Sequence, residues 1–279
     1  MFRDDLLKGK HILVTGGGTG LGAVMATRFA ALGAALTLCG RRADVLAQTA
    51  ARIAADTGAQ VATETCDLRE PGSVDAMLER IFARAPLDVL VNNAAATFLA
   101  QSEHLSARAA DAILGATLHG ALYCTLGVGS RWIAAGRPGV VLSILSTSVR
   151  TGRAFTMPSA VAKSGLQAMT RSLAVEWGPK QIRLVAIAPG PFPTQGAWNQ
   201  LMPAERAQTR DPASRVPLGR VGEPAELANL AAYLVSDGAG YISGETVAID
   251  GAAHLRTSGA EDLLGWGAAE WEALRAKRK

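Results

Sequence analysis

Short apolar runs alternate through most of the chain with longer stretches in which apolar residues recur every three or four positions. Continuous apolar runs are typical of strands buried on both faces, and the amphipathic spacing is typical of helices that connect parallel strands. The pattern therefore predicts an α/β fold with a parallel sheet flanked by helices. The predicted strands are 11–14, 35–39, 60–65, 87–91, 140–144, 182–188 and 245–249, and the predicted helices are 23–32, 43–57, one from about 71, 105–133, 159–177 and 223–236.

A glycine-rich turn separates the first predicted strand from the first predicted helix. It runs from Thr15 to Gly22 as TGGGTGLG and lacks the Gly-Lys-Ser/Thr ending of a mononucleotide-binding phosphate loop. A strand, a glycine turn and a helix in this order bring backbone N–H groups and the positive end of a helix dipole against a phosphate. The turn indicates a dinucleotide site in a single doubly wound, Rossmann-type domain with seven parallel strands.

The end of the second predicted strand bears on which dinucleotide binds. An acidic residue there accepts hydrogen bonds from the 2′-OH of NAD, whereas an arginine accommodates the 2′-phosphate of NADP. No Asp or Glu occurs between Ala34 and Arg42, so the sequence favours NADP(H), with Arg41 as the predicted contact. At the end of the third strand, Asp67 either accepts from the adenine amino group or caps the helix that begins near Pro71.

Polar residues gather at the ends of the later strands, where ligands bind in this architecture. Asn92 and Asn93 follow the fourth strand, and they either tie neighbouring strands together or form an ordinary turn. Serines and threonines follow the fifth strand. Lys163 lies on the next helix among small apolar residues, which favours a placed charge over a snorkelling surface residue. After the sixth strand, the segment 195–217 breaks the alternation, as expected of a segment that covers a ligand.

Composition supports one domain over residues 1–279, with residues 253–279 as a C-terminal extension. The chain is 49% hydrophobic and contains no linker or repeat. Its net charge is +4, but its basic residues are dispersed except at the C-terminus. This favours an anionic small ligand over nucleic acid.

Cysteine usage and hydropathy bear on the compartment. The three cysteines are widely spaced in apolar runs, which indicates reduced core thiols and no metal site. No apolar run reaches the roughly 18 to 20 residues that span a bilayer, and the acidic N-terminus is unlike a secretory signal. We therefore expect a cytoplasmic protein that does not bind membranes.

These motifs together resemble the short-chain dehydrogenase/reductase family over roughly residues 8–251. The resemblance rests on the glycine turn, Asp67, Asn92-Asn93-Ala94, Lys163, Pro189-Gly190, Thr194 and Ile249-Asp250-Gly251. Within the family, the sequences PSAVAK at 158–163 and AVEWG at 174–178 are similar to the 2,4-dienoyl-CoA reductases, which reduce conjugated dienoyl thioesters with NADPH. The resemblance implies that Lys163 holds the nicotinamide ribose and that the long helices 105–133 and 159–177 build a homotetramer. It also implies that Arg69 contacts coenzyme A; the alternative is that Arg69 is a plain surface arginine.

The chain departs from the family at the catalytic tyrosine. Most members carry it four residues before the active-site lysine and the dienoyl-CoA reductases fifteen before it, but Ser159 and Ser148 occupy these positions here. The family's serine falls on Ser146. The asparagine of the dienoyl-CoA reductases falls on His119, which is either a proton donor or a helix residue packed near the sheet.

A serine hydroxyl is too weak an acid to replace tyrosine in ordinary carbonyl reduction, whereas an enolate needs only hydrogen-bond donors while water protonates carbon. We therefore expect an NADP(H)-dependent oxidoreductase of an unsaturated acyl-CoA. The alternatives are an NADP(H)-binding protein without catalysis and an enzyme of a specialised carbonyl or alcohol. The predicted catalytic residues are Lys163, Ser148, Ser146, Ser159 and His119; the predicted cofactor residues are Gly16, Gly18, Thr19, Gly20, Leu21, Gly22, Arg41, Asp67, Asn93, Lys163, Pro189, Gly190, Phe192 and Thr194; the predicted substrate residue is Arg69.

Overall fold

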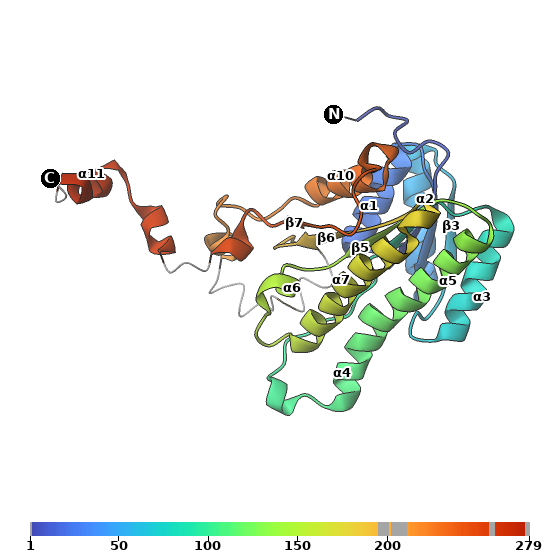
Figure 1. Cartoon of the computed structure of the whole chain (residues 1–279), viewed down its shortest axis with the longest axis horizontal. Helices are drawn as coiled ribbons and strands as arrows, with labels where there is room; N and C mark the ends of the chain where they lie inside the picture. Colours follow the sequence, from blue (N-terminus) through green and yellow to red (C-terminus); the bar gives the residue numbers. More distant parts are fainter. Residues whose placement is uncertain (1, 195–200, 202–210, 257–259, 277–279) are drawn as a thin grey trace.

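The computed structural model describes residues 2–194, 201, 211–256 and 260–276. A seven-stranded parallel sheet with the order β3-β2-β1-β4-β5-β6-β7 lies between two layers of helices (Figure 1). The predicted fold class is therefore confirmed. The strands are β1 (His11–Thr15), β2 (Ala35–Gly40), β3 (Val61–Thr65), β4 (Val89–Asn92), β5 (Gly139–Ile144), β6 (Ile182–Pro189) and β7 (Thr246–Ile249).

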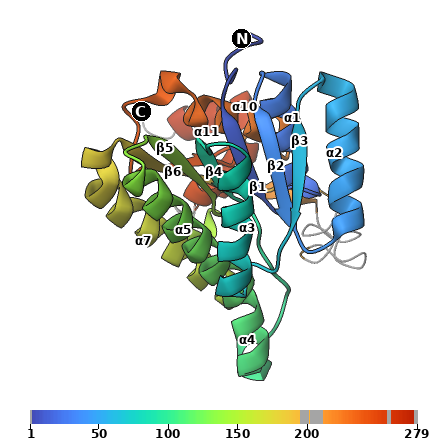
Figure 2. The same ribbon diagram turned by 90° about the vertical axis from the view of Figure 1, so that its right-hand side faces the viewer.

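The strands are apolar at successive positions because both of their faces are covered. Ile12 and Val89 belong to one buried cluster, whereas their neighbours Leu13 and Leu90 belong to the other. Figure 2 shows the helices on the two sides of the sheet. The first cluster packs against α1 (Gly20–Ala31), α2 (Ala43–Thr57) and α10 (Pro224–Val235), and the second against α3 (Pro71–Arg84), α5 (Gly120–Ala134) and α7 (Met157–Trp177).

The helix predicted over 105–133 differs from the expectation. It consists of α4 (Ala107–Leu114), a π-helical turn at Gly115–His119, and α5. The continuous stretch Ala107–Ala134 is long and apolar enough to cross a membrane by length and composition, but half of its most apolar window is buried inside the fold. Its Trp132 is fully buried and donates to the carbonyl oxygen of Leu87 at 2.6 Å. The stretch therefore packs here as a core helix.

Several shorter elements complete the described residues. A one-turn helix, α6 (Ser148–Thr151), follows β5, and the C-terminal extension contains α11 (Ala268–Ala276), which Figure 1 draws apart from the sheet. The rings of Trp266 and Trp271 pack edge to face at 5.2 Å. Most of the predicted covering segment, 195–217, lies outside the described residues. The three cysteines are free and buried, as predicted.

Candidate active site

The glycine turn lies where the strand order reverses, between β1 and β4. Ligands bind at such a switch point, in the crevice beyond the strand ends. Gly16 has φ +65°, and a Cβ added to Gly22 would lie 2.4 Å from the carbonyl oxygen of Gly16. The turn therefore closes directly on the first turn of α1, and only glycine fits at Gly22.

Asn93 and Thr15 fasten this turn to the end of β4. The side-chain amide of Asn93 donates to the carbonyl oxygen of Thr15 at 2.9 Å and to that of Gly16 at 3.3 Å. The Thr15 hydroxyl accepts the N–H groups of Asn93 and Ala94 and donates to the carbonyl oxygen of Val91. The interpretation that this asparagine ties neighbouring strands together is thus confirmed, and Asn93 holds the glycine turn against the end of β4.

The N-terminus of α1 is suited to an anion. Thr19 occupies the N-cap position without a side-chain cap, and the first turn carries no acidic residue. The Thr19 side chain therefore accepts from none of the first N–H groups of the helix, an arrangement that suits a pyrophosphate. Gly18, Gly20 and Leu21 belong to the same turn. These residues fit a dinucleotide.

Arg41 and Asp67, which the sequence analysis assigns to the adenine end of the cofactor, lie just after β2 and β3. Arg41 is exposed just beyond Gly40, the last residue of β2. Arg69 grips Asp67 with two nitrogens: Nε lies 2.9 Å from Oδ1, and Nη2 lies 2.5 Å from Oδ2. The Arg69 guanidinium holds the pKa of Asp67 below its usual value, and the charge of Arg41 acts in the same direction.

Two sequence interpretations change as a result. Asp67 does not cap α3, whose N-cap residue is Glu70, because its carboxylate is bound by Arg69 and by the Arg69 backbone N–H. Arg69 is partly exposed, and its described hydrogen bonds all go to Asp67. A contact with coenzyme A therefore requires Arg69 to share its guanidinium with this carboxylate.

Lys163 connects α7 with the end of β5. It projects from α7, is buried, and donates from Nζ to the carbonyl oxygen of Ile144, the last residue of β5, at 2.5 Å. Burial lowers the pKa of Lys163 to about 8. The sequence places a cation here because small residues surround position 163 on the helix and let the long side chain reach the strand end.

The predicted serines lie on the two segments that Lys163 connects, after β5 and on α7. Ser146 follows β5, and its hydroxyl accepts the N–H of Ser148, which is buried at the start of α6. Ser159 is half-buried on α7 one turn before Lys163, so the two share a face of the helix. His119 is exposed at the end of the π-helical turn, where its ring lies 6.2 Å from that of Tyr123.

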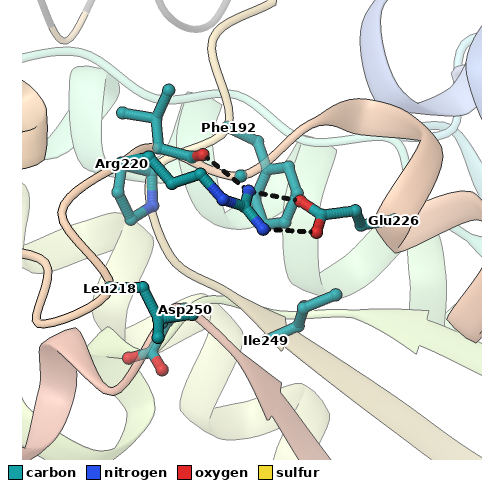
Figure 3. A pocket seen from close by; sticks show the side chains of 10 residues that line it. Phe192, Leu218, Arg220, Glu226, Ile249 and Asp250 are labelled. Atoms are coloured by element: carbon teal, nitrogen blue, oxygen red, sulfur yellow. Dashed lines mark hydrogen bonds and ion pairs between the residues drawn. The ribbon is translucent and has the colours of Figure 1, made fainter.

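The segment after β6 forms the remaining wall. Gly190 donates to the carbonyl oxygen of Ile249 at 3.0 Å, which continues the pairing of β6 with β7 beyond Pro189. Phe192 is buried against Gly222 and lines a small pocket together with Arg220, whose guanidinium forms two hydrogen bonds with Glu226 (Figure 3). Thr194 is half-buried and is the last residue described before 195–200.

Two groups of polar contacts involve residues that the sequence analysis does not name, Thr117 in the first and Arg150 and His254 in the second. Thr117, in the π-helical turn, is fully buried and accepts the N–H of Ala96 just beyond β4. Arg150, His254 and Asp250 form a chain of hydrogen bonds from α6 to β7. Thr117 could not be found from the sequence, because the helical pattern gives no signal of the extra residue that makes a π turn. His254 could not be found because it lies in residues 253–279, which the sequence analysis describes only as a C-terminal extension.

The fold and the glycine turn together are those of a dinucleotide-binding α/β protein, which here carries a buried lysine at the end of β5. A family model described as "Enoyl-(Acyl carrier protein) reductase" matches residues 16–254. The chain belongs to the short-chain dehydrogenase/reductase family of oxidoreductases, whose cofactor is a nicotinamide dinucleotide.

Relatives and a solved structure agree with this assignment. A Caenorhabditis elegans protein named "Probable 2,4-dienoyl-CoA reductase 3 [(3E)-enoyl-CoA-producing]" is 40% identical over 255 residues, 90% of this chain and 82% of the relative. A Bacillus subtilis protein named "Probable 2,4-dienoyl-CoA reductase [(2E)-enoyl-CoA-producing]" is 39% identical over 87% of this chain and 95% of its own. An Agrobacterium tumefaciens structure with bound NADP, described as a "putative 2-deoxy-d-gluconate 3-dehydrogenase", has a TM-score of 0.82 and 31% identity over 91% of this chain and 100% of its own.

Proposed function

We propose that the protein is an NADPH-dependent reductase of 2,4-dienoyl-CoA thioesters. The observation that carries the proposal is the buried Lys163, which donates from Nζ to the carbonyl oxygen of Ile144 shortly before Ser146 and lies one helical turn after Ser159 on α7. Relatives at about 40% identity bear the names of 2,4-dienoyl-CoA reductases.

The preference for NADPH over NADH rests on the adenine end of the crevice. Arg41 is exposed at the end of β2, and no acidic residue between positions 34 and 42 is present to accept from a ribose 2′-OH. A guanidinium is a strong partner for the 2′-phosphate. The similar structure with bound NADP supports the same choice.

Reduction of a conjugated thioester suits the groups that line the site. When bound, NADPH would supply a hydride. Addition of that hydride at carbon 5 of the dienoyl chain would move the electron pair to the thioester oxygen and give a dienolate. Lys163 provides positive charge near this oxygen, and the hydroxyls of Ser146 and Ser148 provide donors. One such donor is worth about 2.7 to 4 kcal/mol. The proton that completes the reaction is delivered to carbon by water, so no tyrosine is required.

Two products are possible from the same dienolate. A proton at carbon 2 gives the 3-enoyl thioester, and a proton at carbon 4 gives the 2-enoyl thioester. The names of the relatives include both outcomes. Reaction in deuterium oxide followed by mass spectrometry and NMR of the product assigns the carbon, because the solvent deuteron marks the position of protonation.

The experiment that tests the function follows NADPH absorbance with purified protein and 2,4-dienoyl-CoA of several chain lengths. We expect saturable turnover and slower reaction with NADH. The panel includes ketones and aldehydes without conjugation, for which we expect background rates. Turnover of these carbonyls alone would favour the specialised carbonyl enzyme.

Tight NADPH binding without turnover of any substrate would favour a binding protein without catalysis. Ser148→Tyr adds a second discrimination. A large gain in rate from this substitution would show that the native site lacks an acid it needs, whereas the proposal expects no large gain.

We also propose that the protein is a homotetramer built on α5 and α7. Val161 and Val175 on α7 are 51% and 81% exposed, and Leu126 on α5 is 46% exposed, so the outer surface of these helices carries unburied apolar side chains. Light scattering after gel filtration tests this, and Val175→Asp is expected to reduce the measured mass. A monomeric wild-type protein would refute it.

A further inference from the structure

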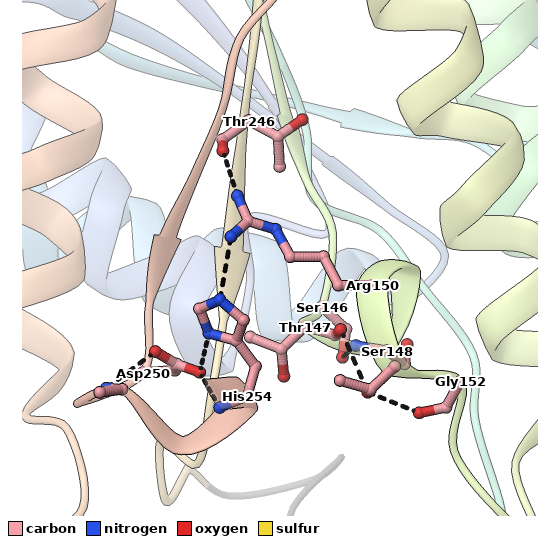
Figure 4. Close-up of polar contacts among 10 residues, drawn as sticks. Ser146, Thr147, Ser148, Arg150, Gly152, Thr246, Asp250 and His254 are labelled. Atoms are coloured by element: carbon pink, nitrogen blue, oxygen red, sulfur yellow. Dashed lines mark hydrogen bonds and ion pairs between the residues drawn. The ribbon is translucent and has the colours of Figure 1, made fainter. Parts of the chain in front are cut away.

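A chain of polar contacts outside the predicted catalytic set links α6 with the end of β7 (Figure 4). Arg150 donates from Nη2 to the carbonyl oxygen of Thr246 at 3.1 Å, and its Nη1 lies 2.9 Å from Nε2 of His254. Nδ1 and the backbone N–H of His254 lie 2.7 and 2.8 Å from Oδ2 of Asp250. The side chains of His254 and Asp250 are only 10% and 3% exposed, so water competes little with these contacts.

The contacts determine the tautomer of His254. A guanidinium nitrogen can only donate, so Nε2 of His254 must accept from Arg150. The ring proton therefore lies on Nδ1, where it is donated to Asp250. In this arrangement Nε2 carries no proton, because a proton there would remove the acceptor that the Arg150 guanidinium uses.

Arg150 belongs to the segment that carries the serine donors, which we call the donor segment (residues 146–151). Within it, α6 is a single turn of four residues. An isolated turn is intrinsically unstable because helix nucleation is unfavourable. The Ser148 donor therefore depends on contacts from outside the segment, and the Arg150 guanidinium supplies two of them.

At its other end, the chain of hydrogen bonds reaches the segment after β6 through Asp250. We call this segment the cofactor segment (residues 189–194). A Cβ added to Gly190 would lie 2.5 Å from Cβ of Asp250, so the two residues are in direct contact. The N–H of Thr147 also donates to the carbonyl oxygen of Pro189 at 3.2 Å. The chain from Arg150 through His254 to Asp250 thus braces the donor segment against the cofactor segment.

We propose that His254 is a positioning residue. With its ring proton on Nδ1, it accepts from Arg150 at Nε2 and so keeps Ser146 and Ser148 in register with the cofactor segment. The catalytic consequence rests on the proposed function. The brace itself can be measured without turnover, so the two can fail separately.

The test compares three variants of the full chain. His254→Phe keeps a planar ring but removes both hydrogen bonds, and His254→Gln keeps a carbonyl that can accept from Arg150. His104→Gln is the control, because His104 is an exposed histidine in a separate 3₁₀ turn, Ser102–His104, which is distant from His254 in the sequence. Should His254→Phe fail to fold, Arg150→Met removes the same contact from the other side.

Hydrogen exchange measures the brace. The amides of Val149, Arg150 and Gly152 donate to carbonyls within the donor segment. We expect these amides to exchange about fivefold faster or more in His254→Phe, less so in His254→Gln, and at the wild-type rate in His104→Gln. Unchanged exchange in His254→Phe and Arg150→Met would overturn the proposal.

Kinetics measure the consequence for the reaction. We expect kcat with 2,4-dienoyl-CoA to fall about tenfold in His254→Phe, with partial recovery in His254→Gln, because a misplaced donor loses transition-state stabilisation. The NADPH dissociation constant should change less than about twofold, because the backbone bond from Gly190 to Ile249 remains. Faster exchange with unchanged kcat would overturn the positioning role. If wild-type protein turns over no dienoyl-CoA, the proposed function fails while the exchange result still decides the brace.

Discussion

Replacing Lys163 by methionine is expected to stabilise the protein while abolishing its activity. Burial lowers the pKa of Lys163 from its ordinary 10.5 to about 8. At about 1.4 kcal/mol per pH unit, a buried ammonium at this position destabilises the folded chain by about 3 kcal/mol below pH 8. Methionine has a similar shape and no charge, but it leaves the Ile144 carbonyl oxygen without its donor, at a cost of about 1 kcal/mol. The net gain expected at pH 7 is about 2 kcal/mol.

The stability that Lys163→Met gains over wild type depends on pH, and the linkage between protonation and folding determines the direction of this dependence. Between pH 8 and 10.5 the unfolded chain binds more protons at Lys163 than the folded chain, so wild-type stability rises with pH through this window. At pH 9.5 most folded wild-type chains carry a neutral Lys163, and the buried lysine destabilises the folded state by only about 1.4 kcal/mol. In Lys163→Met this gain is nearly cancelled by the loss of the hydrogen bond to the Ile144 carbonyl oxygen. The advantage of Lys163→Met should therefore shrink to about zero.

Urea unfolding of cofactor-free protein at pH 7 and 9.5, at one protein concentration, measures this difference. Lys180→Met is the control, because Lys180 is an exposed lysine just after α7 and should show no such pH dependence. We expect dienoyl-CoA turnover of Lys163→Met to fall by about 10²-fold or more. A variant that is less stable than wild type at pH 7, or that gains equally at both pH values, would refute the reasoning.

Three further predictions follow from the same geometry. Gly22→Ala places a Cβ 2.4 Å from the Gly16 carbonyl oxygen and should weaken NADPH binding, measured by calorimetry, about tenfold or more. The control is Gly72→Ala in the first turn of α3, where an added Cβ meets no atom within 4 Å and NADPH binding should stay unchanged. Equal losses of NADPH affinity in the two variants would argue against the close approach of Gly22 to Gly16. Arg41→Ala should weaken NADPH about tenfold and leave NADH unaffected, and equal loss of both would remove the 2′-phosphate assignment. In a pH–rate profile, kcat/KM for NADPH should decline above about pH 8 as Lys163 loses its proton; a flat profile to pH 9.5 would contradict a requirement for its charge.

The hydrophobic pattern predicts the sheet well because the strands are buried on both faces. Ile12 and Leu13 face opposite layers, so the first strand is a continuous apolar run that differs clearly from the amphipathic helices around it. The glycine turn was predictable for a similar reason, since the contact between Gly22 and Gly16 is local in the sequence. Position 163 was predictable because few roles suit a lysine among small apolar neighbours.

The remaining parts of the site depend on contacts that local pattern does not encode. Arg150 and His254 are 104 residues apart, and neither lies in a segment with strong periodicity. The π-helical turn at Gly115–His119 adds one residue to a helix whose apolar spacing stays continuous. The position of Asp67 in the sequence fits a contact with adenine and a helix cap equally well. Only the structure shows that the Arg69 guanidinium donates two hydrogen bonds to its carboxylate.

Transfer of a labelled hydride tests the central claim most directly. Protein in excess over 2,4-dienoyl-CoA is mixed with NADPH that carries deuterium at either position of nicotinamide carbon 4, and the product is analysed by mass spectrometry and NMR. The account predicts a single turnover in which one of the two labelled forms delivers its deuterium to carbon 5 of the acyl chain, with the reaction lost in Lys163→Met. Absence of label in the product of both forms, although NADPH binds, would contradict the account.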